Sequence, residues 1–119
     1  MKSVIIAEDD DDLRCNCARE VKSFGEAEVD VVLNGADLVG RVKQKHYDLI
    51  LTDNNMPRMS GLVAITQIRE FNRSIPICLM SGDNPEEIMP EAMRLGATDY
   101  IEKGMGFRER LIEVIKKYL

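Results

Sequence analysis

The sequence predicts a three-layer α/β fold, in which helices cover both faces of a central parallel sheet. Short apolar runs alternate with amphipathic segments along the whole chain, so that five strands and five helices follow one another. The connecting segments are short, which favours right-handed crossovers between parallel strands. The apolar runs at residues 49–51 and 77–80 are continuous rather than alternating, as expected for strands that are covered on both faces.

The first half of the chain is expected to contain three strands and two helices. In the first helix, apolar residues recur every three or four positions from Leu13 to Phe24, as one apolar helix face requires. Gly25 fits the position just beyond that helix, and Asn34 is suited to capping the second helix. The expected elements are a strand at Ser3–Ala7, a helix at Asp11–Phe24, a strand at Ala27–Leu33, a helix at Ala36–Lys45 and a strand from Asp48 that ends at Asp53.

Capping residues mark the helices of the second half. Ser60 and Asn84 are suited to capping the third and fourth helices, and Pro85 fits the first turn of the fourth. Pro90 falls inside that helix at a cost of about 3 kcal/mol or more, so we expect a kink or a shortened helix there. The expected elements are a helix from Ser60 to about Phe71, a strand at Ile77–Met80, a helix from Asn84 to about Leu95, a strand at Thr98–Glu102 and a helix from about Gly106 to Tyr118.

Length and charge restrict the kind of protein. At 119 residues, with 45% apolar and 31% charged residues, the chain fits one domain, residues 1–119. The net charge is −5 and the 16 Lys and Arg residues are scattered, which argues against direct DNA binding. The apolar run at the N-terminus is too short for a signal peptide or a membrane span, so we expect a cytoplasmic protein without membrane contact. The three cysteines are expected to be reduced thiols.

Polar side chains follow four of the five expected strands. Glu8 and Asp9 come directly after the first strand, and the third strand ends at Asp53. Ser81 follows the fourth strand, and Lys103 follows the fifth. Because the carboxyl ends of parallel strands meet at one edge of the sheet, where ligands bind in open α/β folds, we expect these five side chains to converge.

Carboxylates that converge in this way need a cation. Two of them about 4 Å apart repel by roughly 1 kcal/mol in water and by ~4 kcal/mol at an effective dielectric constant of 20. A divalent metal removes this repulsion, and a site of carboxylates, a backbone carbonyl and waters suits octahedral Mg²⁺. Lys103 and Ser81 at the same edge could bind the oxygens of a phosphoryl group.

Four motifs together resemble the receiver domain of two-component response regulators, in the single-domain form of the chemotaxis regulators. The resemblance covers nearly the whole chain, and the joint order and spacing make it specific, whereas any one motif alone would be weak. It implies a flavodoxin-like sheet with the strand order 2-1-3-4-5. The motifs are Glu8-Asp9 after an apolar strand, Asp53-x-x-Met56-Pro57-x-x-x-Gly61, Pro76-x-x-x-x-Ser81 and Gly96-Ala97-x-x-Tyr100-x-x-Lys103.

The resemblance implies that Asp53 accepts a phosphoryl group from a histidine kinase or a phosphotransfer protein, in a Mg²⁺-dependent reaction. Asp9 and Asp53 would bind the metal directly, Asn55 would offer its backbone carbonyl, and Glu8 would act through a water. The protein would catalyse its own phosphorylation and dephosphorylation, and would act in signalling or in a phosphorelay rather than as an enzyme on another substrate.

The resemblance also implies a switch. Lys103 would pair with one phosphoryl oxygen, Ser81 would donate a hydrogen bond to another, and Tyr100 would turn inward when the Ser81 hydroxyl moves. A downstream protein would read the change on the surface formed by the fourth helix, the fifth strand and the fifth helix. Where the family commonly has a proline after the lysine, preceded by a cis bond, this chain has Gly104, so we expect a trans Lys103–Gly104 bond.

Other interpretations of the same residues exist. The acidic run from Glu8 to Asp12, taken alone, is more often a solvated loop, and Tyr100 could be a plain core residue. A Mg²⁺-dependent phosphatase with an aspartyl nucleophile would normally show a second acid two residues on, where this chain has Asn55. A receiver-like binding module that never takes phosphate is disfavoured by the joint presence of Asp9, Asp53 and Lys103.

Overall fold

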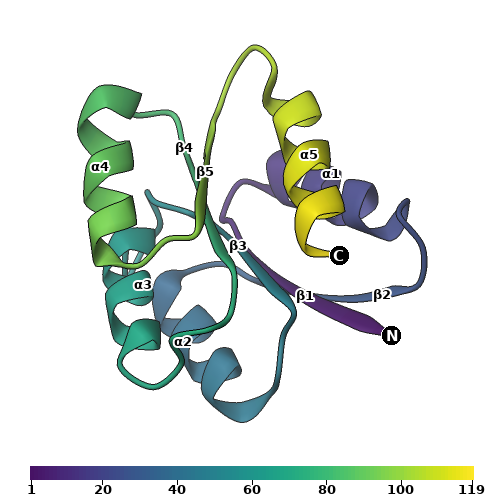
Figure 1. Ribbon diagram of the computed structural model, residues 1–119, viewed down its shortest axis with the longest axis horizontal. Helices are drawn as coiled ribbons and strands as arrows, with labels where there is room; N and C mark the ends of the chain where they lie inside the picture. The colour runs from purple at the N-terminus through teal and green to yellow at the C-terminus, as the bar shows by residue number, and fades with distance from the viewer.

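The computed structural model describes residues 1–119 and confirms the predicted architecture, a parallel five-stranded sheet between two layers of helices (Figure 1). The strand order is β2-β1-β3-β4-β5, and every neighbouring pair is parallel. The elements are β1 (Lys2–Ala7), α1 (Asp11–Lys22), β2 (Ala27–Val32), α2 (Gly35–Gln44), β3 (Leu49–Asp53), α3 (Gly61–Arg69), β4 (Ile77–Ser81), α4 (Pro85–Leu95), β5 (Asp99–Glu102) and α5 (Phe107–Tyr118).

The sheet separates two apolar cores. Ile5 packs into the core under α2, α3 and α4, whereas its neighbour Ile6 packs into the core under α1 and α5. Successive residues of a strand point to opposite faces, so every strand in the middle of the sheet must be apolar on both. β3 and β4 are buried at all positions, as their continuous apolar runs predict.

Side-chain caps define the starts of the helices. The side chains of Asn34, Ser60 and Asn84 accept hydrogen bonds from backbone N–H groups in the first turns of α2, α3 and α4, which confirms the three predicted caps. Asp10 caps α1 in the same way. These caps determine where the chain leaves the carboxyl edge of the sheet and enters each helix.

The predicted end of the first helix is wrong. α1 ends at Lys22, and Phe24 lies beyond it with an exposed side chain. The Phe24 N–H bonds to the carbonyl of Val21 in a tighter turn, which releases the chain before another helical turn can form. Gly25 then adopts a φ of +121°, a conformation that a residue with a Cβ rarely takes.

The helix that contains Pro90 is not shortened, so of the two outcomes expected there only the kink stays a prediction. α4 runs from Pro85 to Leu95 without a break. Pro90 is on the exposed side of the helix, so that its ring displaces no packed side chain and the carbonyl it leaves unpaired can bind water. Gly96 ends the helix with a φ of +120°. None of the helices has the length and apolar content needed to span a membrane.

Candidate functional site

The structure brings three carboxylates together at the carboxyl edge of the sheet. Glu8 and Asp9 follow β1, and Asp53 ends the adjacent strand β3. One carboxylate oxygen from each lies within 4.8 Å of the other two. Glu8 and Asp53 are buried, whereas Asp9 is exposed. The cluster is therefore open to a ligand on the side of Asp9.

Lys103 lies between the two buried carboxylates. Its Nζ is 2.8 Å from Oδ1 of Asp53 and 3.0 Å from Oε1 of Glu8. Burial alone lowers the pKa of Lys103, but its hydrogen bonds with Asp53 and Glu8 more than offset this and the net shift is upward. The chain has no cis peptide bond, so the expected trans Lys103–Gly104 bond is confirmed.

Glu8 is in an unusual position for a carboxylate. It is fully buried, and its second oxygen, Oε2, has no hydrogen-bond partner. Burial raises the pKa of Glu8 to about 7, the nearby Asp53 carboxyl adds to the shift, and Lys103 offsets part of it. An unpartnered buried oxygen beside two other carboxylates suits a hard divalent cation or one of its bound waters, so this set of residues fits a metal such as Mg²⁺.

The loop between β3 and α3 holds Asp53 in place. Asn54 is buried, and its carbonyl and side-chain oxygens accept hydrogen bonds from the N–H groups of Gly61 (2.9 Å) and Leu62 (3.1 Å). A Cβ on Gly61 would lie 2.2 Å from the carbonyl oxygen of Asp53, so only glycine allows this approach. The Gly61 of the sequence motif is thus explained, but nothing in the sequence singled out Asn54.

Ser81 is buried at the end of β4 and hydrogen-bonded to the loop that follows. Its Oγ donates to Oδ2 of Asp83 (3.1 Å) and accepts from the backbone N–H of Asp83 (3.0 Å). The side chain of Asn55, two residues after Asp53, donates to the same Asp83 oxygen (3.2 Å). Asp83 therefore connects two of the expected site residues.

Tyr100 lies on β5 with only 7% of its surface exposed. Its hydroxyl is buried and has no hydrogen-bond partner, and burial raises the pKa of Tyr100. The ring borders a surface cavity that Met89 of α4 and Met105 of the β5–α5 loop also line. Tyr100 is thus already buried in this structure, next to apolar side chains that are exposed, and a change in its position on phosphorylation stays a prediction.

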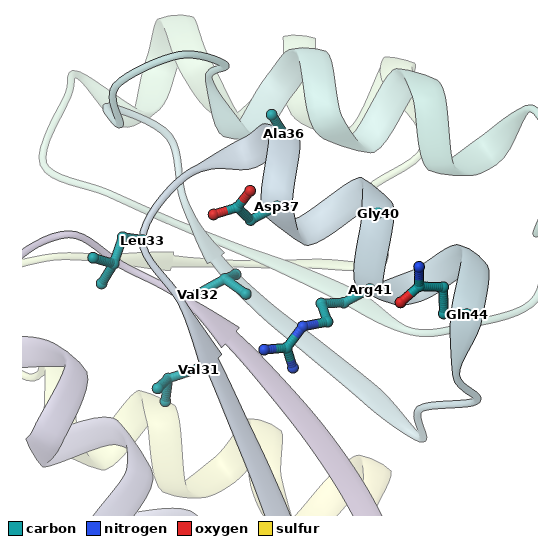
Figure 2. A pocket seen from close by; sticks show the side chains of 8 residues that line it. All are labelled: Val31, Val32, Leu33, Ala36, Asp37, Gly40, Arg41 and Gln44. Carbon is teal, nitrogen blue, oxygen red and sulfur yellow. The ribbon is translucent and has the colours of Figure 1, made fainter.

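The largest cavity lies elsewhere. It is at the open edge of the sheet, between β2 and α2, and Figure 2 shows the side chains around it. Its two charged side chains already have partners. Oδ1 of Asp37 is 3.4 Å from Nη1 of Arg58, and Nη1 of Arg41 is 3.8 Å from Oδ2 of Asp30. None of the converging residues lines this cavity, so the chemistry of the chain is concentrated at the acidic cluster.

The fold and the cluster define an α/β domain with an acidic site that fits a metal at the carboxyl edge of its sheet, and comparison with known proteins identifies its family. The sequence model of the response regulator receiver domain matches residues 4–116. The chain therefore belongs to the response regulator receiver domain family of two-component systems.

Longer regulators are among the relatives of the chain. It is 32% identical over 115 residues to the transcriptional regulatory protein ZraR of Salmonella typhimurium (strain LT2), which covers 97% of this chain and 26% of that protein. It is 26% identical over 111 residues to the transcriptional regulatory protein PrrA of Mycobacterium tuberculosis, covering 93% of this chain and 47% of that one. The chain thus spans between about a quarter and a half of the length of these relatives.

Solved receiver structures have the same fold. The chemotaxis response regulator CheY4 of Vibrio cholerae superimposes with a TM-score of 0.88 at 24% identity, over 100% of this chain and 99% of that one. The response regulator TrrA of Thermotoga maritima, solved in complex with Mg²⁺ and BeF, has a TM-score of 0.86 at 28% identity, and the match covers both chains completely. These matches confirm the flavodoxin-like fold and its strand order.

Proposed function

We propose that this receiver domain, residues 1–119, accepts a phosphoryl group on Asp53 in a Mg²⁺-dependent reaction. The donor would be a sensor histidine kinase or a phosphotransfer protein. The observation that carries the proposal is the position of Asp53, whose buried carboxylate is 2.8 Å from Lys103 and within 4.8 Å of the Glu8 and Asp9 oxygens. Glu8 has the same neighbours, but it follows β1 and has no exposed surface, whereas Asp53 is the last residue of β3 and keeps some exposure.

The carboxylate cluster supplies the ligands for the metal. Asp9 and Asp53 would bind Mg²⁺ directly, the backbone carbonyl of Asn55 would complete the protein ligands, and Glu8 would act through a bound water. TrrA, which is 28% identical to this chain, was solved in complex with Mg²⁺ and BeF, and this supports a metal site here. When bound, the ion neutralises the clustered carboxylates and shields the negative charge of the incoming phosphoryl group.

In the transfer step, one oxygen of Asp53 attacks the phosphorus of a phosphohistidine. A P–O bond forms, the P–N bond breaks with its electron pair leaving on the imidazole, and an aspartyl phosphate results. Lys103 is already in contact with the Asp53 carboxylate and would pair with an oxygen of the transferred group. Ser81 would donate a hydrogen bond from its hydroxyl to another oxygen. The domain thus catalyses its own phosphorylation, and later its own dephosphorylation.

The phosphorylated state would be read by a downstream protein. Movement of the Ser81 hydroxyl toward the phosphoryl group changes the space beside Tyr100, whose buried hydroxyl lacks a partner. Beside Tyr100, Met89 of α4 and Met105 of the β5–α5 loop are exposed and suit an apolar contact with a partner on the surface of α4, β5 and α5. We place this exchange in the cytoplasm, without membrane contact, and the net charge of −5 supports the absence of direct DNA binding.

Intact-mass spectrometry after incubation with acetyl phosphate tests the proposal. We expect the mass of one phosphoryl group to appear with Mg²⁺ and to be absent when EDTA replaces it. Acetyl phosphate replaces the unidentified kinase, so the measurement depends on the receiver domain alone. An unmodified protein under all conditions would contradict the proposed function.

A further inference from the structure

Asp83 holds the hydroxyl of Ser81 in two hydrogen bonds. Ser81 Oγ donates to Asp83 Oδ2 over 3.1 Å, and the backbone N–H of Asp83 donates to the same Oγ over 3.0 Å. Ser81 itself is fully buried, so water does not compete for its hydroxyl. The hydroxyl is therefore both donor and acceptor within one short loop.

A serine hydroxyl has only one proton to donate. While that proton points to Asp83, it cannot point to a phosphoryl oxygen on Asp53. A hydrogen bond to an ionised carboxylate is about twice as strong as one to a neutral acceptor, so the loss of the Asp83 bond offsets much of what Ser81 gains from a new bond to a phosphoryl oxygen. Asn55 stabilises the arrangement, because its amide donates to the same Asp83 oxygen over 3.2 Å.

We propose that Asp83 is a positioning residue that keeps the Ser81 hydroxyl turned away from the phosphoryl site in the unphosphorylated domain. This inference rests on the proposed phosphorylation of Asp53. Phosphorylation must then break the Ser81–Asp83 hydrogen bond before Ser81 can hold the phosphoryl group. Asp83 thereby favours the unphosphorylated state and lowers the affinity of the site for a phosphoryl group.

The negative charge of Asp83 could oppose a phosphoryl group in a second way, by direct repulsion. The two effects differ in their dependence on Ser81. Repulsion acts whether or not residue 81 has a hydroxyl, whereas the positioning effect disappears with it. A double-mutant cycle between Ser81 and Asp83 separates them, because it measures the coupling of the two side chains.

The probe is beryllofluoride with Mg²⁺, titrated into the domain and followed by the amide resonances of the site in NMR spectra. We expect Asp83→Ala to bind beryllofluoride about tenfold more tightly than the wild type, as the loss of one charge-assisted hydrogen bond predicts. In the Ser81→Ala background, the same substitution should change the affinity by less than about twofold. In the Ser81→Thr background, which keeps the hydroxyl, the gain of about tenfold should return.

Glu87→Ala is the matched control, since Glu87 is an exposed carboxylate that lines the same surface groove as Asp83 and has no hydrogen bond to Ser81. It should leave the affinity within about twofold of the wild type. An equal gain from Asp83→Ala with and without the Ser81 hydroxyl, or no gain in the wild-type background, would overturn the inference. Failure of the wild type to bind beryllofluoride would instead contradict the proposed function itself.

Discussion

Glu8 is the residue whose chemistry depends most on its surroundings. A carboxylate on a surface loop would ionise well below neutral pH, but this one is fully buried, and burial raises its pKa to about 7. Lys103 contacts only one of its two oxygens, and the other has no partner. In the absence of a metal, an ionised Glu8 therefore has a net cost to the folded state.

This cost makes the stability of the metal-free domain depend on pH. Because the pKa of Glu8 is about 7 in the folded state and 4.5 ordinarily, ionisation destabilises the fold progressively as pH rises through this range, by up to about 3 kcal/mol. Glu8→Gln cannot ionise, so in EDTA its advantage over the wild type should be small near pH 4.5 and largest above pH 7. Urea unfolding near pH 4.5 and above pH 7 measures the difference in the free energy of unfolding between Glu8→Gln and the wild type. With exposed Glu26→Gln as control, an advantage of Glu8→Gln that does not change with pH would count against the raised pKa.

Gly61 shows how a residue without a side chain contributes to the site. A Cβ at this position would collide with the carbonyl of Asp53 at 2.2 Å, so the loop would have to move. Gly61→Ala should destabilise the domain by about 1–3 kcal/mol and slow phosphorylation of Asp53 by acetyl phosphate. Gly40→Ala is the control, because a Cβ there meets nothing and helix propensity should stabilise α2 by about 0.5–1 kcal/mol. Similar losses in the two variants would rule out the specific role of Gly61.

At the residue scale, the sequence predicted which side chains converge but not how they are connected. Parallel strands end at one edge, so the positions of Asp53, Ser81 and Lys103 at strand ends were sufficient to bring them together. The hydrogen bonds of Asp83 and the buried amide of Asn54 depend on loop conformations, which no local sequence pattern determines.

At the scale of single elements, local chemistry was the best guide to where helices begin. The Asn34, Ser60 and Asn84 caps are all confirmed, because a cap depends only on the residue and the N–H groups that follow it. Helix ends were less predictable. The apolar periodicity of the sequence continues to Phe24, but α1 ends at Lys22. The Phe24 ring is exposed, and the packing of the rest of the molecule, rather than the local sequence, decides this.

One side chain connects the end of α3 to the segment between α4 and β5. The guanidinium of Arg69, at the end of α3, donates to the Gly96 carbonyl (2.8 Å), the Asn72 carbonyl (3.1 Å) and the Thr98 hydroxyl (3.2 Å). Its Cγ would lie 2.6 Å from a Cβ at Gly96, so that the glycine provides the space for the arginine.

Arg69→Met keeps the aliphatic stem and removes these hydrogen bonds. Because partly buried carbonyls would lose their hydrogen-bond donors, we expect the free energy of unfolding to fall by about 2–3 kcal/mol, as measured by unfolding in urea. Arg73→Met, which changes an exposed arginine with no interaction partner in the structure, should alter stability by less than about 0.5 kcal/mol. Indistinguishable midpoints for the two variants would contradict the role of Arg69 in joining these elements.

At the scale of the whole molecule, the strand order explains why the site exists. β1 and β3 are neighbours in the sheet although α1, β2 and α2 separate them in the sequence, and this places Glu8 and Asp9 beside Asp53. β4 and β5 follow in order and bring Ser81 and Lys103 to the same edge. The strand order could be predicted only through the resemblance to a family, since alternation of strands and helices alone is compatible with several orders.

A cation that binds only the folded cluster should stabilise the whole domain. Mg²⁺ at 100 times its dissociation constant should increase the free energy of unfolding by about 2.7 kcal/mol and so raise the melting temperature. Asp9→Ala removes the exposed carboxylate of the cluster and should be nearly indifferent to Mg²⁺. Differential scanning calorimetry with and without Mg²⁺ measures both proteins. An equal rise in the two would mean that the ion binds elsewhere.

The most direct test of the central claim is the site of phosphorylation. Wild type, Asp53→Asn and Asp12→Asn are incubated with acetyl phosphate and Mg²⁺, and intact masses are recorded over time. Asp12 is the matched control because it belongs to the same acidic segment as Asp9 and lies outside the cluster. If Asp53 is the phosphoacceptor, wild type and Asp12→Asn each gain one phosphoryl group and Asp53→Asn gains none. Incorporation into Asp53→Asn at the wild-type level would contradict the assignment.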